Sequence, residues 1–144
     1  MTVTHLLIRP FQEGDEESLV SLWNMCKLTV PWNNPYKDIA RKLNVQAELF
    51  LVGYLEYKLI SSVMGGYDGH RGWINYLAVH PDFQARGYGN QLMDNVETRL
   101  RKLGCPKINL QIREGNDKVF SYYQKLGFVE EKRISMGKRL EDDQ

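Results

Sequence analysis

The chain has 144 residues, of which 42% are hydrophobic and 26% charged, and its formal net charge is +1. This length suits a single domain over residues 1–144, and the apolar content is too high for a disordered chain. The small net charge excludes a global field that would attract nucleic acid or an anionic membrane. The longest apolar stretch, residues 49–55, is too short to span a bilayer, and residues 1–5 lack a signal pattern. We therefore expect a cytoplasmic protein.

The first third of the sequence predicts one strand and two helices. The strand covers residues 3–9, and Asp15 is a plausible N-cap of the first helix. The apolar residues of that helix recur at helical spacing and are Leu19, Leu22, Trp23 and Cys26. Prolines bound a rigid loop at residues 30–35, and a short second helix is expected from about residue 36 to residue 44.

The middle of the sequence predicts three consecutive strands. They cover residues 49–55, 59–67 and 73–79, with a turn at residues 68–72 before the third. Alternation assigns the side chains of the third strand to two faces, with Leu77 and Val79 on one and Ile74, Tyr76 and Ala78 on the other. Apolar residues on both faces are typical of a central strand.

The second half predicts a long helix, a strand, another helix and a last strand. The apolar stripe of the long helix consists of Leu92, Met93, Val96, Leu100 and Leu103. The strand covers residues 108–112, Asn116 or Asp117 caps the next helix, Gly127 ends it and Phe128 begins the last strand. The order β-α-α-β-β-β-α-β-α-β is that of a mixed sheet with helices on its faces, in the class α/β, or α+β by some schemes.

A glycine-rich loop at residues 84–90 precedes the long helix. Gly87 and Gly89 allow the backbone to turn sharply and to approach a ligand closely. The first N–H groups of a helix have no internal partners, and together with the positive end of the dipole they bind anions. Arg86 can add to this site, and pyrophosphate is the anion most often held in this way.

Other interpretations of the loop are weaker or less informative. A dinucleotide fingerprint needs a third glycine where this sequence has Leu92, and an acidic residue at the end of the next strand. A P-loop needs Gly-Lys-Ser/Thr, which the sequence lacks. Taken alone, the loop also fits a plain turn that uses glycine only for its geometry.

A second motif, Asn-x-x-Val-x-x-x-Tyr-x-x-Leu-Gly-Phe, consists of Asn116, Val119, Tyr123, Leu126, Gly127 and Phe128. Together with Gln-x-x-Gly-x-Gly at residues 84–89, it resembles the GNAT (GCN5-related N-acetyltransferase) superfamily over nearly the whole chain. More narrowly, the sequence resembles bacterial YpeA-type members, which are close to ribosomal-protein alanine acetyltransferases. The resemblance implies a GNAT-type sheet splayed at its centre and acetyl transfer from acetyl-coenzyme A to a primary amine in a ternary complex.

The resemblance also implies where acetyl-coenzyme A binds, and it implies no metal. The pyrophosphate would lie on the glycine-rich loop, and the pantetheine arm would pair with the end of the third central strand like an added strand. The expected cofactor contacts are Leu77, Ala78, Val79, Gln84, Ala85, Arg86, Gly87, Tyr88, Gly89, Asn90, Asn116 and Tyr123.

Two catalytic groups follow from the same resemblance. The Val79 N–H is the expected donor to the acetyl carbonyl oxygen, and Tyr123 is the expected acid that protonates the leaving thiolate. Purely structural roles are the alternatives, because Tyr123 can be an aromatic residue of the core and Asn116 can be only a helix cap. Tyr122 presents the same chemistry on another helix face, so the choice of Tyr123 depends on the family spacing.

No carboxylate lies on the strand at residues 73–79, where many relatives carry a glutamate. We therefore expect a water relay through backbone carbonyls, Asn75 or Tyr76, with Asp68 and His70 as reserve candidates. Deprotonation at pH 7 costs about 4.6 kcal/mol for a lysine amine and about 1.4 kcal/mol for an α-amine. A site without a strong base should therefore favour an α-amine or a weakly basic small amine.

The acceptor is expected against the loop at residues 30–35 and the turn at residues 68–72. The substrate-binding candidates are Trp32, Asn33, Asp68, His70 and Tyr76. Trp32 can instead be a core plug, and Asp68 and His70 can belong to a solvated turn. The acceptor would be a small molecule or a protein N-terminus. A non-catalytic acyl-coenzyme A sensor is the alternative function, and a homodimer through the last strand is compatible with the family.

Overall fold

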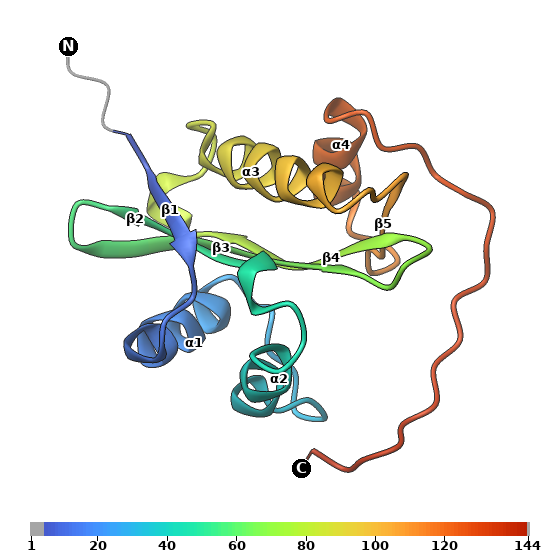
Figure 1. Ribbon diagram of the computed structural model, residues 1–144, viewed down its shortest axis with the longest axis horizontal. Coiled ribbons are helices and arrows are strands. Elements are labelled where there is room, and N and C mark those ends of the chain that lie inside the picture. The colour runs from blue at the N-terminus through green and yellow to red at the C-terminus, as the bar shows by residue number, and fades with distance from the viewer. Residues whose placement is uncertain (1–4, 144) are drawn as a thin grey trace.

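The computed structural model describes residues 5–143, which form one five-stranded sheet with helices on both of its faces (Figure 1). The strands lie side by side in chain order: β1 (Leu7–Pro10), β2 (Phe50–Leu55), β3 (Lys58–Tyr67), β4 (Gly72–Val79) and β5 (Ile108–Leu110). Neighbouring strands are antiparallel, except that β4 and β5 are parallel. The predicted mixed, mostly antiparallel sheet is confirmed.

The α-helices of the described residues cover the sheet in two pairs. Helices α1 (Glu16–Met25) and α2 (Pro35–Lys42) lie on one face, and α3 (Tyr88–Lys102) and α4 (Asp117–Lys125) lie on the other (Figure 1). Short 3-10 helices at Glu13–Asp15, Ala47–Leu49 and Pro81–Phe83 precede α1, β2 and the glycine-rich loop, respectively.

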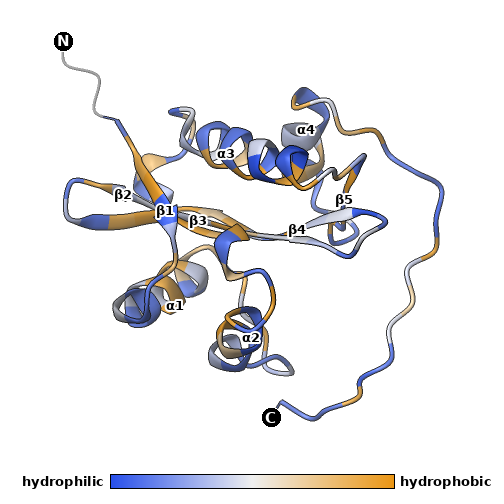
Figure 2. Cartoon of the chain, viewed as in Figure 1, coloured by the Kyte–Doolittle hydropathy of each residue, from blue (hydrophilic) through white to orange (hydrophobic). Residues whose placement is uncertain are grey.

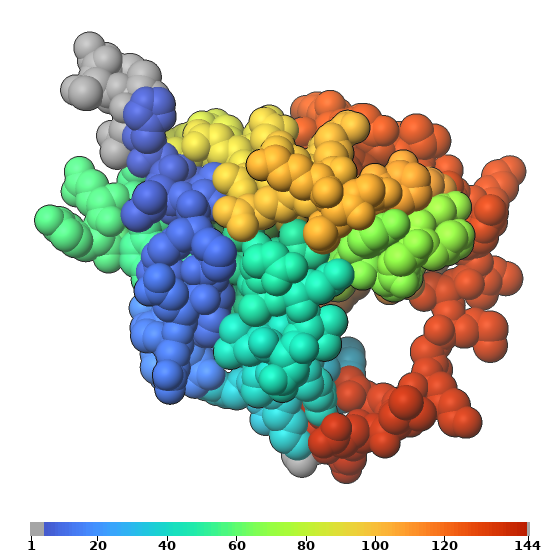
Figure 3. All heavy atoms as spheres, viewed as in Figure 1, coloured from blue at the N-terminus to red at the C-terminus, as the bar shows by residue number. Residues whose placement is uncertain are grey.

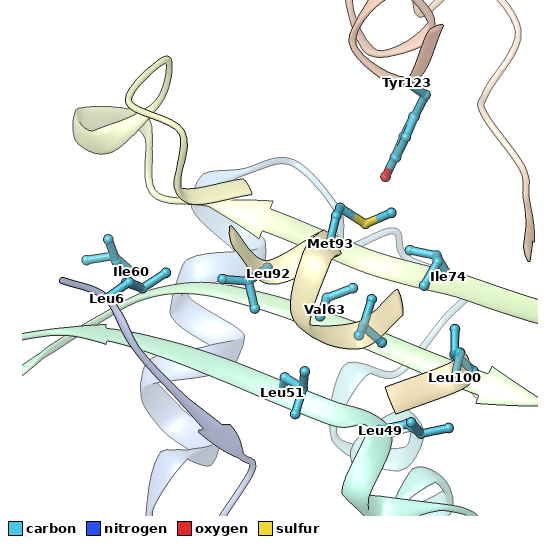
Figure 4. Close-up of a cluster of buried hydrophobic side chains, with 11 residues drawn as sticks. Leu6, Leu49, Leu51, Ile60, Val63, Ile74, Leu92, Met93, Leu100 and Tyr123 are labelled. Atoms are coloured by element: carbon cyan, nitrogen blue, oxygen red, sulfur yellow. The ribbon is translucent and has the colours of Figure 1, made fainter. Parts of the chain in front are cut away.

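Each face of the sheet carries its own hydrophobic core, and apolar residues concentrate on the strands and on the helix sides that face them (Figure 2). The stripe of α3 packs on the sheet as predicted and comprises Leu92, Met93, Val96 and Leu100 (Figure 4). Leu103 is the C-cap residue beyond the helix and is 46% exposed, so its predicted place in the stripe is wrong. On the α1 side, Trp23 and Phe50 are fully buried.

Several element boundaries differ from their predicted positions. Residues 3 and 4 of the predicted first strand lie outside the described residues, and β1 begins at Leu7. Strand β5 ends at Leu110, two residues earlier than expected. Helix α2 already begins at Pro35, because Asn34 caps it by accepting hydrogen bonds from the backbone N–H groups of the first turn, and a proline fits the first helical position.

Asp15 is the N-cap residue of α1, as predicted, but its side chain does not cap the helix. Its carboxylate instead accepts hydrogen bonds from the Arg9 guanidinium at 2.7 and 3.0 Å, from the Tyr54 hydroxyl at 2.6 Å and from the Gln12 N–H at 2.8 Å. Burial raises the pKa of this carboxyl, but the bonds from Arg9 and Tyr54 outweigh burial and lower the pKa overall. Asp15 therefore ties β1 and β2 to the start of α1.

Strand β4 contains a bulge that the sequence did not reveal. The register against β3 shifts between Ser62 and Met64, and Tyr76 takes a left-handed conformation with φ of 52°. A bulge adds one residue to a strand and reverses the alternation beyond it. Ile74 therefore packs in the α3-side core, whereas Tyr76 and Ala78 pack on the α1 side, so the predicted placement of Ile74 on their face is wrong.

The last strand predicted from Phe128 does not form within the described residues. Phe128 packs edge-to-face on Tyr123, and residues 129–143 form an extended C-terminal arm that passes β5 and returns to α2 (Figure 1). Figure 3 shows an opening between this arm and the rest of the molecule. Four successive charged residues, 130–133, interrupt the alternation that a half-buried strand needs, which accounts for the wrong prediction.

Candidate active site

The two parallel strands separate halfway along β4. Strand β4 pairs with β5 only at Gly72, Trp73 and Ile74, so residues 75–79 have no strand partner on that side within the described residues. The opening lies at the carboxyl ends of parallel strands, where the edges of both backbones become available to a ligand. The predicted splay at the centre of the sheet is therefore present.

Val79 directs its backbone into this opening. The N–H of the next residue, His80, donates to the Ile60 carbonyl of β3 at 2.7 Å, and backbone groups of an antiparallel strand alternate between its two sides. The Val79 N–H and carbonyl therefore face away from β3. Its carbonyl accepts hydrogen bonds from Gln84 Nε2 at 3.0 Å and from Cys26 Sγ at 3.3 Å. Gln84 thus ties the glycine-rich loop to the end of β4.

The other predicted contacts on β4 differ in their accessibility. Leu77 is half-buried and packs against the α3-side core, next to the opening. Ala78 is buried on the α1 side, so its side chain does not reach the opening.

The glycine-rich loop leaves the first turn of α3 open. Ala85 and Gly87 both have positive φ, 62° and 85°, which turns the chain sharply into the helix at Gly87, its N-cap residue. Among the described residues no side chain caps this N-terminus, and its first turn contains no acidic residue. Arg86 is exposed and lies over the ring of Phe83, at 5.5 Å. The unpaired N–H groups, the helix dipole and Arg86 together favour an anion here.

Helix α4 packs closely against this first turn. A Cβ at Gly89 would lie 2.8 Å from the Tyr122 hydroxyl, which donates to Asn90 Oδ1 at 2.9 Å. A side chain at Gly89 would displace the Tyr122 hydroxyl, so Gly89 also has a packing role. Asn116 caps α4 by accepting the N–H of Val119 at 3.4 Å, as predicted.

Tyr123 points from α4 toward Met93 and the sheet (Figure 4). Its side chain is buried, and its hydroxyl has no hydrogen-bond partner within residues 5–143. Burial and, to a smaller extent, the neighbouring Tyr122 raise the pKa of this phenol above its usual value. The hydroxyl of Tyr123 therefore stays protonated at neutral pH and is free to donate a hydrogen bond.

Tyr76 anchors a polar cluster on the opposite face of the sheet. Its ring stacks on Trp23 with centroids 3.8 Å apart, and its hydroxyl donates to Asp38 Oδ2 at 2.7 Å. Asn33 Nδ2 donates to the same Asp38 oxygen at 2.5 Å and to the Tyr76 hydroxyl at 3.1 Å. Burial first, and then the bond to Asp38, raises the pKa of Tyr76.

This cluster opens into a cavity of about 690 Å³ between α2, the bulge of β4 and the loop after β5. Its lining includes Trp32, Asn33, Asp38, Asn75, Tyr76 and Arg113. Trp32 is 55% exposed, so it does not plug the core, and the alternative that it forms a wall of the site fits the structure.

The other two candidates for the general base, Asp68 and His70, lie on the β3–β4 turn, away from this cavity. Asp68 Oδ1 accepts the N–H groups of His70 and Arg71 at 2.7 Å each, which stabilises the β3–β4 turn. Asp68 and His70 are exposed and do not line this cavity, as expected for a solvated turn.

Sequence reasoning missed Asp38 and Arg113. Asp38 follows the N-cap Asn34 on a helix beside the predicted acceptor loop, which is a weak signal, and its partner Tyr76 is 38 residues away in the chain. Arg113 follows the strand that lies next to β4. Only the folded chain brings both residues to the same cavity as Asn75.

The comparison with known families decides the classification. Residues 3–128 match the family described as the acetyltransferase (GNAT) family. The protein belongs to the GNAT acetyltransferase family. It is an N-acetyltransferase, and members of this family generally transfer acetyl from acetyl-coenzyme A to amines. The resemblance inferred from the two motifs is thus confirmed.

Individual relatives agree with this membership. A protein of Yersinia enterocolitica named acetyltransferase is 50% identical over 137 residues, which is 95% of this chain and 97% of the relative. The aminoglycoside antibiotic 6'-N-acetyltransferase of Acinetobacter haemolyticus has a TM-score of 0.74 at 19% identity, covering 94% of this chain and 99% of that one. The ribosomal-protein-S18-alanine N-acetyltransferase of Escherichia coli has a TM-score of 0.72 at 20% identity, covering 88% and 79%. At these identities the two solved structures support the fold of this GNAT protein.

The described residues contain neither a membrane-spanning helix nor a metal-binding cluster. None of the helices within residues 5–143 is long and apolar enough to cross a membrane. In the same part of the chain, no group of three or more His, Cys, Asp or Glu side chains is arranged to hold a metal ion.

Proposed function

We propose that the protein, acting as a single domain, transfers the acetyl group of acetyl-coenzyme A to an α-amine of a peptide or protein, or to a weakly basic small amine. The observation that carries this proposal is the position of the opening beside Val79. It lies between the uncapped N-terminus of α3 and the polar cavity around Tyr76. A pyrophosphate and an amine can thus approach the opening from different sides.

The loop at residues 84–90 fits the pyrophosphate of acetyl-coenzyme A. The first-turn N–H groups of Tyr88, Gly89 and Asn90 are without side-chain caps, and Arg86 adds a positive charge. The pantetheine arm would run along residues 77–79, where the unpaired backbone of β4 can accept it like an added strand. Asn116 and Tyr123 would line the same path from α4.

Val79 and Tyr123 would carry the chemistry. The Val79 N–H would donate to the acetyl carbonyl oxygen, where a preorganised donor stabilises developing negative charge. Tyr123 would donate its proton to the leaving sulfur, which its protonated and unpartnered hydroxyl supports. Tyr122 is a weaker candidate, because its hydroxyl already donates to Asn90.

Direct attack by the amine is favoured over an acetylated cysteine. Cys26 is the thiol near Val79, and burial raises its pKa. A thiol that stays protonated is a poor nucleophile, because the thiolate is the reactive form. Cys26 therefore fits a packing role, and the acceptor amine itself would attack.

The α-amine preference depends on the absence of a carboxylate on β4. Deprotonating an α-amine at pH 7 costs about 1.4 kcal/mol, against about 4.6 kcal/mol for lysine. A water relay through Asn75, Tyr76 and backbone carbonyls suffices for the smaller cost. The solved alanine N-acetyltransferase from Escherichia coli shows by its name that the same fold serves such an acceptor.

Thiol release tests this proposal. Purified protein is incubated with acetyl-coenzyme A and matched lysine-containing peptides whose N-terminus is either free or blocked, and free thiol is measured with a chromogenic reagent. We expect release with the free N-terminus and little with the blocked peptide. Acetylation of lysine alone would contradict the α-amine preference. Binding of acetyl-coenzyme A without turnover on any amine would instead identify a sensor.

A further inference from the structure

The acceptor-side cavity has an uneven distribution of charge. Its ionisable lining residues are the acidic Asp38 and the basic Arg41, Lys42, Arg113 and Arg139. Acidic side chains neutralise one of these cations, because Arg41 pairs with Asp143 at 2.8 Å and with Glu141 at 3.0 Å. The cavity therefore has one carboxylate and an excess of positive charge.

Lys42, Arg113 and Arg139 carry this excess. None of the three forms an ion pair with any residue in the described part of the chain. Lys42 is half-buried, and this burial lowers the pKa of its ammonium, against a smaller opposing effect of the nearby Glu48. Arg113 is exposed on the loop after β5 and lines the same cavity as Asn75. An anion bound between Lys42 and Arg113 would compensate the positive charges of both side chains.

Asp38 offers the opposite chemistry. Its Oδ2 atom is held by Tyr76 and Asn33, while its Oδ1 atom contacts only Arg41 at 3.5 Å. The side chain is 21% exposed and lines the cavity, so it can contact a bound acceptor. A carboxylate fixed through one oxygen is a preorganised acceptor for an ammonium or amine N–H.

Building on the proposed function, we propose that the acceptor carries an anionic group, a carboxylate or a phosphate, in addition to its amine. Asp38 positions the amine, and Arg113 and Lys42 bind the anionic group. The same charges disfavour a polycationic acceptor, such as the aminoglycoside named for the Acinetobacter haemolyticus neighbour. Like charges placed opposite each other disfavour wrong ligands.

Dipeptides that share an N-terminal alanine test this inference. Alanyl-alanine and alanyl-phosphoserinamide carry an anion, alanyl-alaninamide is neutral apart from its amine, and alanyl-lysinamide carries a second cation. We expect kcat/KM to be about ten- to a hundred-fold higher for one or both anionic peptides than for alanyl-alaninamide, as for one charge-assisted hydrogen bond. Alanyl-lysinamide should be the poorest. The better of the two anionic peptides identifies the source of the charge.

Single substitutions test which residues produce the preference for anionic peptides. Arg113→Gln should reduce the preference for the anionic peptides over alanyl-alaninamide about ten-fold, through a higher KM for the anionic peptides. Lys125→Gln removes an exposed cation of α4 that does not line the cavity, and should leave the preference intact. Asp38→Asn keeps the shape and an acceptor for Tyr76, and should raise KM for all four peptides more than it lowers kcat.

Several results would overturn the inference while the proposed function survives. One is wild-type turnover of alanyl-alaninamide or alanyl-lysinamide that equals or exceeds turnover of both anionic peptides. Another is a loss of acetyl-coenzyme A affinity in Arg113→Gln, because Arg113 would then belong to the cofactor site. Absence of thiol release with every amine would contradict the proposed function itself.

Discussion

Two adjacent tyrosines of α4 have different environments. The Tyr122 hydroxyl is bonded to Asn90 and lies against Gly89, whereas the Tyr123 side chain is buried and its hydroxyl has no partner among the described residues. That hydroxyl is not sealed off, because the described residues contain a buried side-chain oxygen without a partner only at Ser61, so a ligand can still reach it. This contrast supports Tyr123 as the proton donor, on grounds independent of motif spacing.

Replacing Tyr123 with phenylalanine separates a catalytic from a packing role. Tyr123→Phe removes only an unpartnered hydroxyl, so the free energy of unfolding in urea should stay the same or increase. We expect kcat to fall about ten- to a hundred-fold, within the lower range of acid–base catalysis, with little change in acetyl-coenzyme A affinity. Tyr122→Phe serves as the matched control. Equal losses in kcat and affinity would make Tyr123 a binding residue.

The raised pKa of Tyr123 affects how kcat/KM depends on pH. Burial disfavours the phenolate, so the pKa lies above about 10 and the proton donor is present throughout the neutral and mildly alkaline range. We therefore expect kcat/KM to rise with pH up to the pKa of the acceptor amine and then to level off, without an alkaline fall below about pH 10. A fall between pH 8 and 9, in protein that circular dichroism shows to be folded, would argue against Tyr123 as the acid.

At the scale of elements, the start of α3 is the feature to test. Gly89 is a poor probe, because any side chain there would meet Tyr122. Ala85 is exposed and left-handed, a conformation that both aspartate and asparagine tolerate. Ala85→Asp should weaken acetyl-coenzyme A binding roughly ten-fold or more by charge repulsion, whereas the isosteric Ala85→Asn should have little effect. Equal affinities of the two variants would place the pyrophosphate elsewhere.

The sequence predicted some elements well because their signals are local. The stripe of α3, the glycine-rich turn before it and the Asn116 cap each depend on residues within one helix or loop. The bulge at Tyr76 is different, because it arises from the pairing of β4 with β3. Asp38 acquires meaning only through Tyr76, which no local pattern links to it.

The C-terminal arm shows the limit of a family pattern. Phe128 follows the helix as the motif predicts, but the charged residues after it do not continue as a strand. The apolar side chains of the arm are exposed: Val129, Ile134, Met136 and Leu140. The homodimer expected through a last strand stays a prediction.

At the scale of the whole molecule, Trp23 connects the α1-side core to the acceptor cavity, because it stacks on the cavity residue Tyr76. Its ring is fully buried, stacks on Tyr76, and its Nε1 donates to Ser62 Oγ at 2.9 Å. Ser62 in turn donates to the Tyr76 carbonyl at 2.8 Å. The bulge that presents Tyr76 to the cavity is therefore fixed by the core.

A pair of core variants tests this connection. Trp23→Phe should lower the free energy of unfolding by about 1–3 kcal/mol and also raise the acceptor KM, since Tyr76 loses part of its stacking surface. Leu22→Ala, in the same helix and core, should cost about 2–5 kcal/mol without changing the acceptor KM. Urea unfolding and steady-state kinetics measure both effects. An unchanged acceptor KM in Trp23→Phe would show that packing in the core does not influence acceptor binding.

The central claim is that the opening beside Val79 and the N-terminus of α3 form a binding site for acetyl-coenzyme A. Calorimetric titration of the purified wild-type protein with acetyl-coenzyme A tests it most directly, with NAD and ATP as control ligands. We predict saturable binding of acetyl-coenzyme A to a single site in the micromolar range, and no comparable binding of either control. Absence of acetyl-coenzyme A binding to protein that is folded by circular dichroism would contradict the claim.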